Sequence, residues 1–121
     1  MSEVIDTPAV FDPSALHSLT GHDRDEELAL VLAGRYLRLL PERVRRIAAA
    51  LHAQDPDEAM DAVLSLKVSS DTLGARELGA LGATLERHLR LVDLVAARAA
   101  SRALVPAAKR LERALTAYLA H

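Results

Sequence analysis

The sequence predicts an all-α fold, an antiparallel up-down-up-down four-helix bundle with a short extra helix at its N-terminal end. The composition is the first reason: 50% of the 121 residues are hydrophobic, but the only aromatic residues are one Phe and two Tyr. Residues of high helix propensity dominate, and few β-branched or aromatic residues remain to build a sheet. The second reason is that apolar residues recur at helical spacing in four long segments. Short connections between such segments favour antiparallel neighbours.

The chain length fits one ordinary domain, which we expect over residues 11–121. Residues 1–10 show no sustained apolar pattern and are expected to be a disordered lead-in. Asp12 and Pro13 then begin the short helix, because Asp can cap a helix and Pro suits its first turn. This helix should end near Leu19, just before Gly21.

The first two long helices are separated by Asp55. One runs from the acidic start at residues 23–27 to about residue 51, with Pro41 inside it. The apolar stripe resumes beyond Pro41, so we expect a single kinked helix there and not two helices. The other, from about Pro56 to Thr72, follows the cap at Asp55.

Two further long helices complete the predicted bundle. The third follows Gly74, and its stripe is formed by Leu78, Leu81, Leu85, Leu89 and Val92. The fourth covers roughly residues 94–120, and we expect a second kink at Pro106.

Composition also excludes several classes of function. Without cysteine there is no disulfide, thiolate metal site or cysteine nucleophile. A net charge of -2 gives no support for nucleic-acid binding. The N-terminal residues lack the pattern of a secretion signal, and no apolar run is long enough to cross a membrane, so we expect a cytoplasmic protein. No metal or other cofactor is expected, since no paired metal ligands recur at i, i+4.

Residues 64–75 read Leu-Ser-Leu-Lys-Val-Ser-Ser-Asp-Thr-Leu-Gly-Ala. This segment resembles the signature of histidine phosphotransfer (HPt) domains, which is His-x-Leu-Lys-Gly-Ser-Ser/Ala followed after a short spacer by Gly-Ala. The matching positions are Leu66, Lys67, Ser69, Ser70, Gly74 and Ala75. Residues 11–16, 36–41 and 77–86 also resemble segments of the family, so that the resemblance extends from about Phe11 to Leu119.

The resemblance implies a helical bundle of a two-component or phosphorelay pathway, with a receiver domain or a histidine kinase as its partner. Two positions depart from the signature: Leu64 stands in place of the phospho-accepting histidine, and Val68 in place of the glycine. Phosphotransfer needs an imidazole nitrogen as the nucleophile, and leucine has no lone pair. The family's glycine resembles a clearance site for the partner, which the stiff side chain of Val68 would fill.

The same helix carries two stripes. One is expected to face the core and consists of Val63, Leu66, Ser70 and Leu73. The other, here called the docking strip, consists of Met60, Leu64, Lys67, Val68 and Asp71. In the family this second stripe points to solvent and docks receiver domains. We therefore expect an apolar surface that binds a partner, unless the N-terminal segment or a rotated bundle buries it.

Other candidate residues have simpler interpretations. The five histidines, expected to be solvated or capping residues, are His17, His22, His52, His88 and His121. Nothing supplies a base to Ser69 or Ser70, so they are interpreted as small packing residues. Two basic clusters are interpreted as solvated helix faces balanced by Glu42 and Glu112; they consist of Arg43, Arg45 and Arg46, and of Lys109, Arg110 and Arg113.

Three functions follow as hypotheses. The first is a pseudo-HPt binding module, not an enzyme, that docks a receiver domain or a histidine kinase without carrying phosphoryl. The second is a structural module that forms a homodimer through Met60, Leu64 and Val68. The third is an enzyme that uses another histidine, either His52 or His88.

Overall fold

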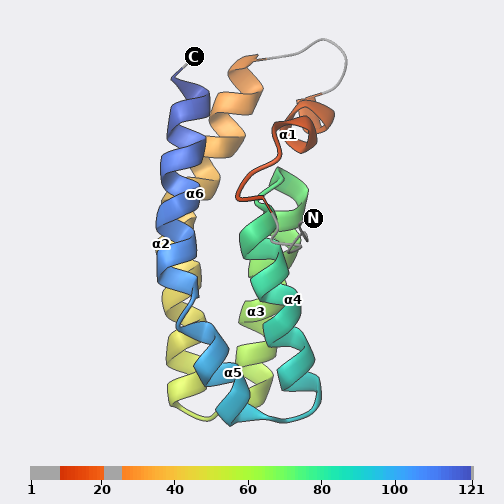
Figure 1. Ribbon diagram of the computed structural model, residues 1–121, viewed down its shortest axis with the longest axis vertical. Coiled ribbons are helices and arrows are strands. Elements are labelled where there is room, and N and C mark those ends of the chain that lie inside the picture. Colours follow the sequence, from red (N-terminus) through yellow and green to blue (C-terminus); the bar gives the residue numbers. More distant parts are fainter. Residues whose placement is uncertain (1–8, 21–25, 121) are drawn as a thin grey trace, which may run out of the picture.

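A computed structural model describes residues 9–20 and 26–120, and confirms the all-α prediction (Figure 1). The described residues form six helices: α1 (Pro13–Thr20), α2 (Glu26–His52), α3 (Pro56–Leu73), α4 (Arg76–Arg90), α5 (Leu94–Ser101) and α6 (Leu104–Leu119). Helices α2, α3, α4 and α6 lie along the long axis, and α1 is the short extra helix (Figure 1). Most of the predicted lead-in, and also Gly21, lies outside the described residues.

The core is formed by one apolar face of each long helix, with Leu16 of α1 added at one end. Ser70 is the one polar side chain buried among the described residues. Its Oγ lies 2.7 Å from Oη of Tyr36, so that α2 and α3 share a buried hydrogen bond. Burial raises the pKa of Tyr36 to about 12, and the phenol therefore keeps its proton at neutral pH.

Helix α2 continues through Pro41, which confirms the expectation of one helix and not two. The ring cannot donate to the carbonyl of Leu37, but Pro41 is exposed, so water can reach this part of the helix. The apolar residues on both sides of Pro41 pack into the same core, and this packing keeps the segment helical.

The fourth predicted helix is divided into α5 and α6, with a break at Arg102 and Ala103. The helix is thus not kinked at Pro106, as was expected, but interrupted four residues before it. Pro106 has no N–H for the carbonyl of Arg102, and its ring would clash with that carbonyl in a continuous helix. After the break, Pro106 lies in the first turn of α6, where the missing N–H has no intrahelical partner to lose.

Val92 does not lie on the stripe of α4, as was predicted from its spacing. The helix ends at Arg90, and Val92 is 68% exposed with a left-handed φ of 54°. Its N–H donates to the carbonyl of Leu89 at 2.9 Å, and the N–H of Asp93 donates to His88, also at 2.9 Å, which closes the helix end. A β-branched residue is strained in this conformation.

We therefore expect Val92→Gly to raise the free energy of unfolding by roughly 1 kcal/mol, because glycine adopts a positive φ without this strain. Urea unfolding followed by circular dichroism measures the change. Val95→Gly is the matched control, since Val95 is exposed but helical, and it should lower the stability instead. Equal losses in both variants would show that Val92 is not strained.

Candidate functional site

Helix α3 carries the docking strip and is fixed at both ends. The Asp55 side chain caps its start by accepting from the N–H of Glu58 at 3.1 Å, and Pro56 occupies the first turn. Gly74 ends the helix with a left-handed φ of 92°. The N–H of Ala75 donates to the carbonyl of Ser70 at 2.8 Å, so the last turn is closed.

The core face of α3 is the predicted one, because all four of its residues are buried. With this face turned to the core, the side of α3 that carries Val68 faces outward, and Val68 is 61% exposed. Leu64 is half-buried and does not belong to the buried core cluster. The position that resembles the family's phospho-acceptor is therefore at the surface of α3, with a valine one turn further along the helix.

The rest of the docking strip is less exposed than predicted. Met60 is half-buried and packs against the core, so that it contributes only an edge to the surface. Lys67 is also half-buried, whereas Asp71 is exposed. The apolar part of the surface is consequently narrow and consists of Val68 with the edge of Leu64.

Two glycines of α4 let α3 approach closely beside this strip. A Cβ atom on Gly82 would lie 2.9 Å from Cβ of Lys67, and one on Gly79 would lie 2.1 Å from Oδ1 of Asp71. Both distances are shorter than a van der Waals contact. The absence of side chains at Gly79 and Gly82 therefore makes room for Lys67 and Asp71 against α4.

Charged groups flank the strip on the α4 side. Nζ of Lys67 lies 2.9 Å from Oε1 of Glu86, and Arg90 contacts the other oxygen of this carboxylate at 2.5 Å. Only 13% of the Glu86 side chain is exposed. The hydrogen bonds from Lys67 and then Arg90 outweigh the effect of burial and lower the pKa of Glu86.

Arg43 of α2 flanks the strip on its other side. Its Nη1 donates to Oγ of Ser69 at 2.6 Å and to the carbonyl of Ser65 at 3.2 Å. The basic cluster of α2 was predicted to be a solvated face, but Arg43 ties α2 to α3. Arg46 in the same cluster also crosses to α3, where it pairs with Glu58 at 2.6 Å.

The Lys67–Glu86 pair predicts a loss of stability in acid. The pKa of Glu86 is lower in the folded chain than in the unfolded chain. The stabilisation by this ion pair is therefore present above the ordinary glutamate pKa of about 4.3. It is lost as the pH falls through the pKa that Glu86 has in the folded chain. We expect Glu86→Gln to lower stability at pH 7 and to flatten its dependence on pH below 5. Urea unfolding at several pH values checks this, with the exposed Glu112→Gln as the control; parallel pH curves for wild type and Glu86→Gln would contradict it.

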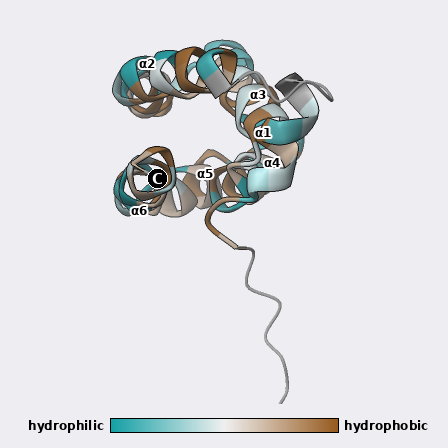
Figure 2. Cartoon of the chain, turned by 90° about the horizontal axis from the view of Figure 1, so that it is seen from above, coloured by the Kyte–Doolittle hydropathy of each residue, from teal (hydrophilic) through white to brown (hydrophobic). Residues whose placement is uncertain are grey.

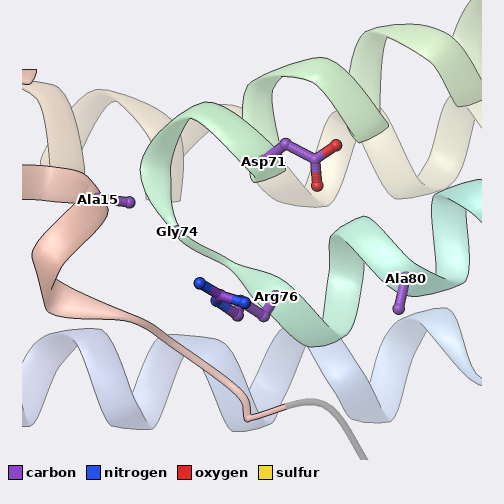
Figure 3. Close-up of a pocket in the computed structure, with 5 residues that line it drawn as sticks. All are labelled: Ala15, Asp71, Gly74, Arg76 and Ala80. Carbon is purple, nitrogen blue, oxygen red and sulfur yellow. The ribbon is translucent and has the colours of Figure 1, made fainter.

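A hollow of about 310 Å³ lies at the C-terminal end of the strip, between α1 and the turn from α3 to α4 (Figure 3). Its lining residues are Ala15, Asp71, Gly74, Arg76 and Ala80. Arg76 pairs with Asp12 at 2.6 Å, and the N–H of Asp12 donates to the carbonyl of Gly74 at 2.7 Å. Hydrogen bonds from Ser14 and Arg76 lower the pKa of Asp12. These contacts of Asp12 anchor the segment before α1 to the end of α3.

The three histidines among the described residues have no hydrogen bond or ion pair with the strip. Nε2 of His17 lies 3.0 Å from Oη of Tyr118, His52 is exposed at the end of α2, and His88 lies in the last turn of α4. His22 and His121 lie outside the described residues. Within residues 9–20 and 26–120, no three His, Asp or Glu side chains are grouped to hold a metal ion. No helix in these ranges has the length and apolar character needed to cross a membrane.

Comparison with known proteins identifies the family. The model of the Hpt domain family matches residues 31–121, which is most of the chain. Histidine-containing phosphotransfer protein B of Pseudomonas aeruginosa PAO1 has the same fold, with a TM-score of 0.81 and 24% identity over 91% of this chain and 94% of that one. The HPT domain of a sensor hybrid histidine kinase from Shewanella gives a TM-score of 0.74 and 22% identity over 92% and 94%. No curated protein sequence matches this chain.

Proposed function

Because this chain belongs to the Hpt domain family, and so to phosphorelay signalling, we propose that it is a pseudo-HPt module that binds a partner without carrying phosphoryl. One observation carries the proposal: Leu64 occupies the position on α3 that resembles the family's phospho-accepting histidine. A leucine side chain has no nitrogen to accept the group. The partner would be a receiver domain or a histidine kinase.

The surroundings of Leu64 favour binding. Val68 exposes an apolar side chain one turn from Leu64. Arg43 lies on one side, and Lys67 and Arg90 lie on the other. Burying an exposed valine or leucine contributes about 1.5–3 kcal/mol, and the half-buried Leu64 would contribute less. Cations at the edge of an apolar patch speed association with an acidic surface and orient it.

Transfer from a phosphorylated receiver domain tests the chemical half of the proposal. The receiver is labelled with radioactive acetyl phosphate, mixed with the chain and separated on a gel. We expect the label to stay on the receiver while titration calorimetry detects binding. Acid-labile label on this chain would show that another residue accepts phosphoryl and would overturn the proposal.

Substitution of Val68 tests the binding half. Val68→Asp should weaken binding to the receiver or kinase by about tenfold, because it places a carboxylate in the apolar contact. The matched control is Val95→Asp, since Val95 is exposed on α5, a helix that does not carry the docking strip. If the two variants bind equally well, the strip is not the docking surface.

A homodimer through the same strip is the weaker candidate. Met60 packs against the core, so Val68 and the edge of Leu64 are left as the apolar contact. Stable dimers usually bury about 800 Å² on each partner, with an apolar centre. Sedimentation of the wild type and of Leu64→Asp decides: a dimer lost in the variant would support self-association.

A further inference from the structure

A second apolar surface lies between α2 and α6. These helices form two arms of the bundle on the side away from α3 and α4 (Figure 2). Between them is a groove of about 390 Å³, within the range of about 300–1,000 Å³ for ligand pockets. Its apolar lining includes Leu37, Pro41, Val44 and Ala48 of α2 and Val105 and Ala108 of α6.

The apolar face of α2 extends beyond the groove toward the N-terminal end of the helix. Leu30 and Gly34 continue the stripe at helical spacing, and Leu30 is 48% exposed. From Leu30 to Ala48 the stripe covers five turns, or about 27 Å. An apolar stripe of this length fits the apolar face of a partner helix.

Gly34 is an independent indication that something packs here. Glycine inside a helix is destabilising relative to alanine, so it needs a reason. A Cβ atom on Gly34 would meet only Nη1 of Arg38, at an ordinary 3.8 Å, and nothing in the described chain requires a glycine. The absence of a side chain does allow the backbone of another molecule to approach α2 closely.

The charges around the groove indicate the sign of the partner. Lys109 lines the α6 wall, and neither it nor Arg38 has an ion pair in the described part of the chain. Arg45 lines the α2 wall and pairs only with the exposed Glu42. The charged lining thus consists of Arg45, already paired with Glu42, of Lys109, and of one carboxylate, Glu112. The cations without an ion pair there, Arg38 and Lys109, outnumber Glu112, so an acidic helix is favoured over a second copy of this surface.

We propose that the α2/α6 groove, with the extension to Leu30, binds one amphipathic helix of a partner protein. The apolar side of that helix carries large residues at i, i+4 and i+7, which enter the groove, and its flanks are acidic. The docking strip lies on α3, whereas this groove lies between α2 and α6, so the chain can hold two partners at once. The inference does not depend on the proposed function.

A synthetic peptide provides the test. The probe is an 18-residue helix with leucine at i, i+4, i+7 and i+11 and glutamate on both flanks; its control has lysine in place of every glutamate. We expect saturable binding of the acidic peptide by fluorescence anisotropy, about tenfold tighter than that of the basic peptide. Lys109→Glu should reduce this preference, and Arg102→Glu, on an exposed residue outside the groove, should not.

Three variants separate the groove from the rest of the surface. Ala48→Trp fills the groove and should weaken binding of the acidic peptide at least about tenfold. Ala49→Trp is the matched control, because Ala49 is exposed but does not line the groove, and it should bind like wild type. Gly34→Ala should raise the melting temperature and yet weaken binding of the acidic peptide. If Gly34 had only a structural role, stability and binding would not change in opposite directions.

The inference is overturned if the acidic peptide shows no saturable binding, or if Ala48→Trp and Ala49→Trp reduce binding equally. It is also overturned if the chain sediments as a dimer that Ala48→Trp dissociates, since the occupant would then be a second copy. Binding of a receiver domain to α3 should be unchanged by Ala48→Trp. Failure here is therefore distinguishable from failure of the pseudo-HPt proposal, which Val68→Asp tests.

Discussion

A chain that carries both Leu64→His and Val68→Gly will accept phosphoryl from a phosphorylated receiver domain, whereas the wild-type chain will not. The histidine supplies the missing nucleophile at the surface of α3. The glycine removes the branched side chain that is 61% exposed one turn away. Lys67 is already held beside the site by Glu86. The amount of acid-labile radioactive label on the chain measures the transfer. We expect none on the wild type and a detectable amount on the double variant.

The single variants separate the two causes. Leu64→His alone should be labelled at least about tenfold more slowly than the double variant if Val68 hinders the partner's approach. Val68→Gly alone should remain unlabelled. The exposed glycine costs roughly 0.5–1 kcal/mol of helix stability, so circular dichroism should show a folded bundle. A folded double variant that binds a receiver but takes no label would contradict the view that only the chemistry was lost.

Gly74→Ala is expected to lower the free energy of unfolding by about 2–4 kcal/mol. Alanine is strained at a φ of 92°, and its Cβ atom would lie 2.4 Å from the carbonyl oxygen of Asp12 and 2.9 Å from Cβ of Ala15. Both contacts belong to the segment that anchors α1 on the end of α3. Relief of the clash would separate this segment from the bundle, and urea unfolding reports the loss.

The same substitution at Gly34 is the control, and it should have the opposite sign. Gly34 lies inside α2, where a Cβ atom would meet only Nη1 of Arg38 at an ordinary 3.8 Å, so alanine should raise the stability by roughly 0.5–1 kcal/mol. Comparable losses at the two positions would mean that neither the backbone conformation nor the approach of Asp12 explains Gly74.

The two proposed surfaces have different physical origins. The docking strip is narrow, lies on one helix and is flanked by cations that are already tied to neighbours, such as Arg43 and Lys67. The α2/α6 groove is formed by two helices and includes Lys109, which has no ion pair among the described residues. A module of this kind would join two proteins of a signalling pathway without changing either chemically.

The sequence alone determined the rotation of α3 and most of the helices, although it did not reveal the break between α5 and α6. Apolar spacing is a local property of the chain, and it correctly assigned Val63, Leu66, Ser70 and Leu73 to the core. The end of α3 at Gly74 was equally local, because that position needs a left-handed backbone. The absence of an imidazole at position 64 also follows from the residue itself. None of these features depends on which helix packs against which.

Only the tertiary structure decided what surrounds the strip. Met60 turned toward the core, and Arg43 reached from α2 to Ser69, because these positions depend on how closely the neighbouring helices approach. Gly79 and Gly82 set that approach, and spacing within α4 does not reveal which side chains they admit. The groove between α2 and α6 likewise arises from two segments far apart in the sequence. Local periodicity decides which face of a helix is apolar, whereas packing between helices distant in the sequence decides which residues that face contacts.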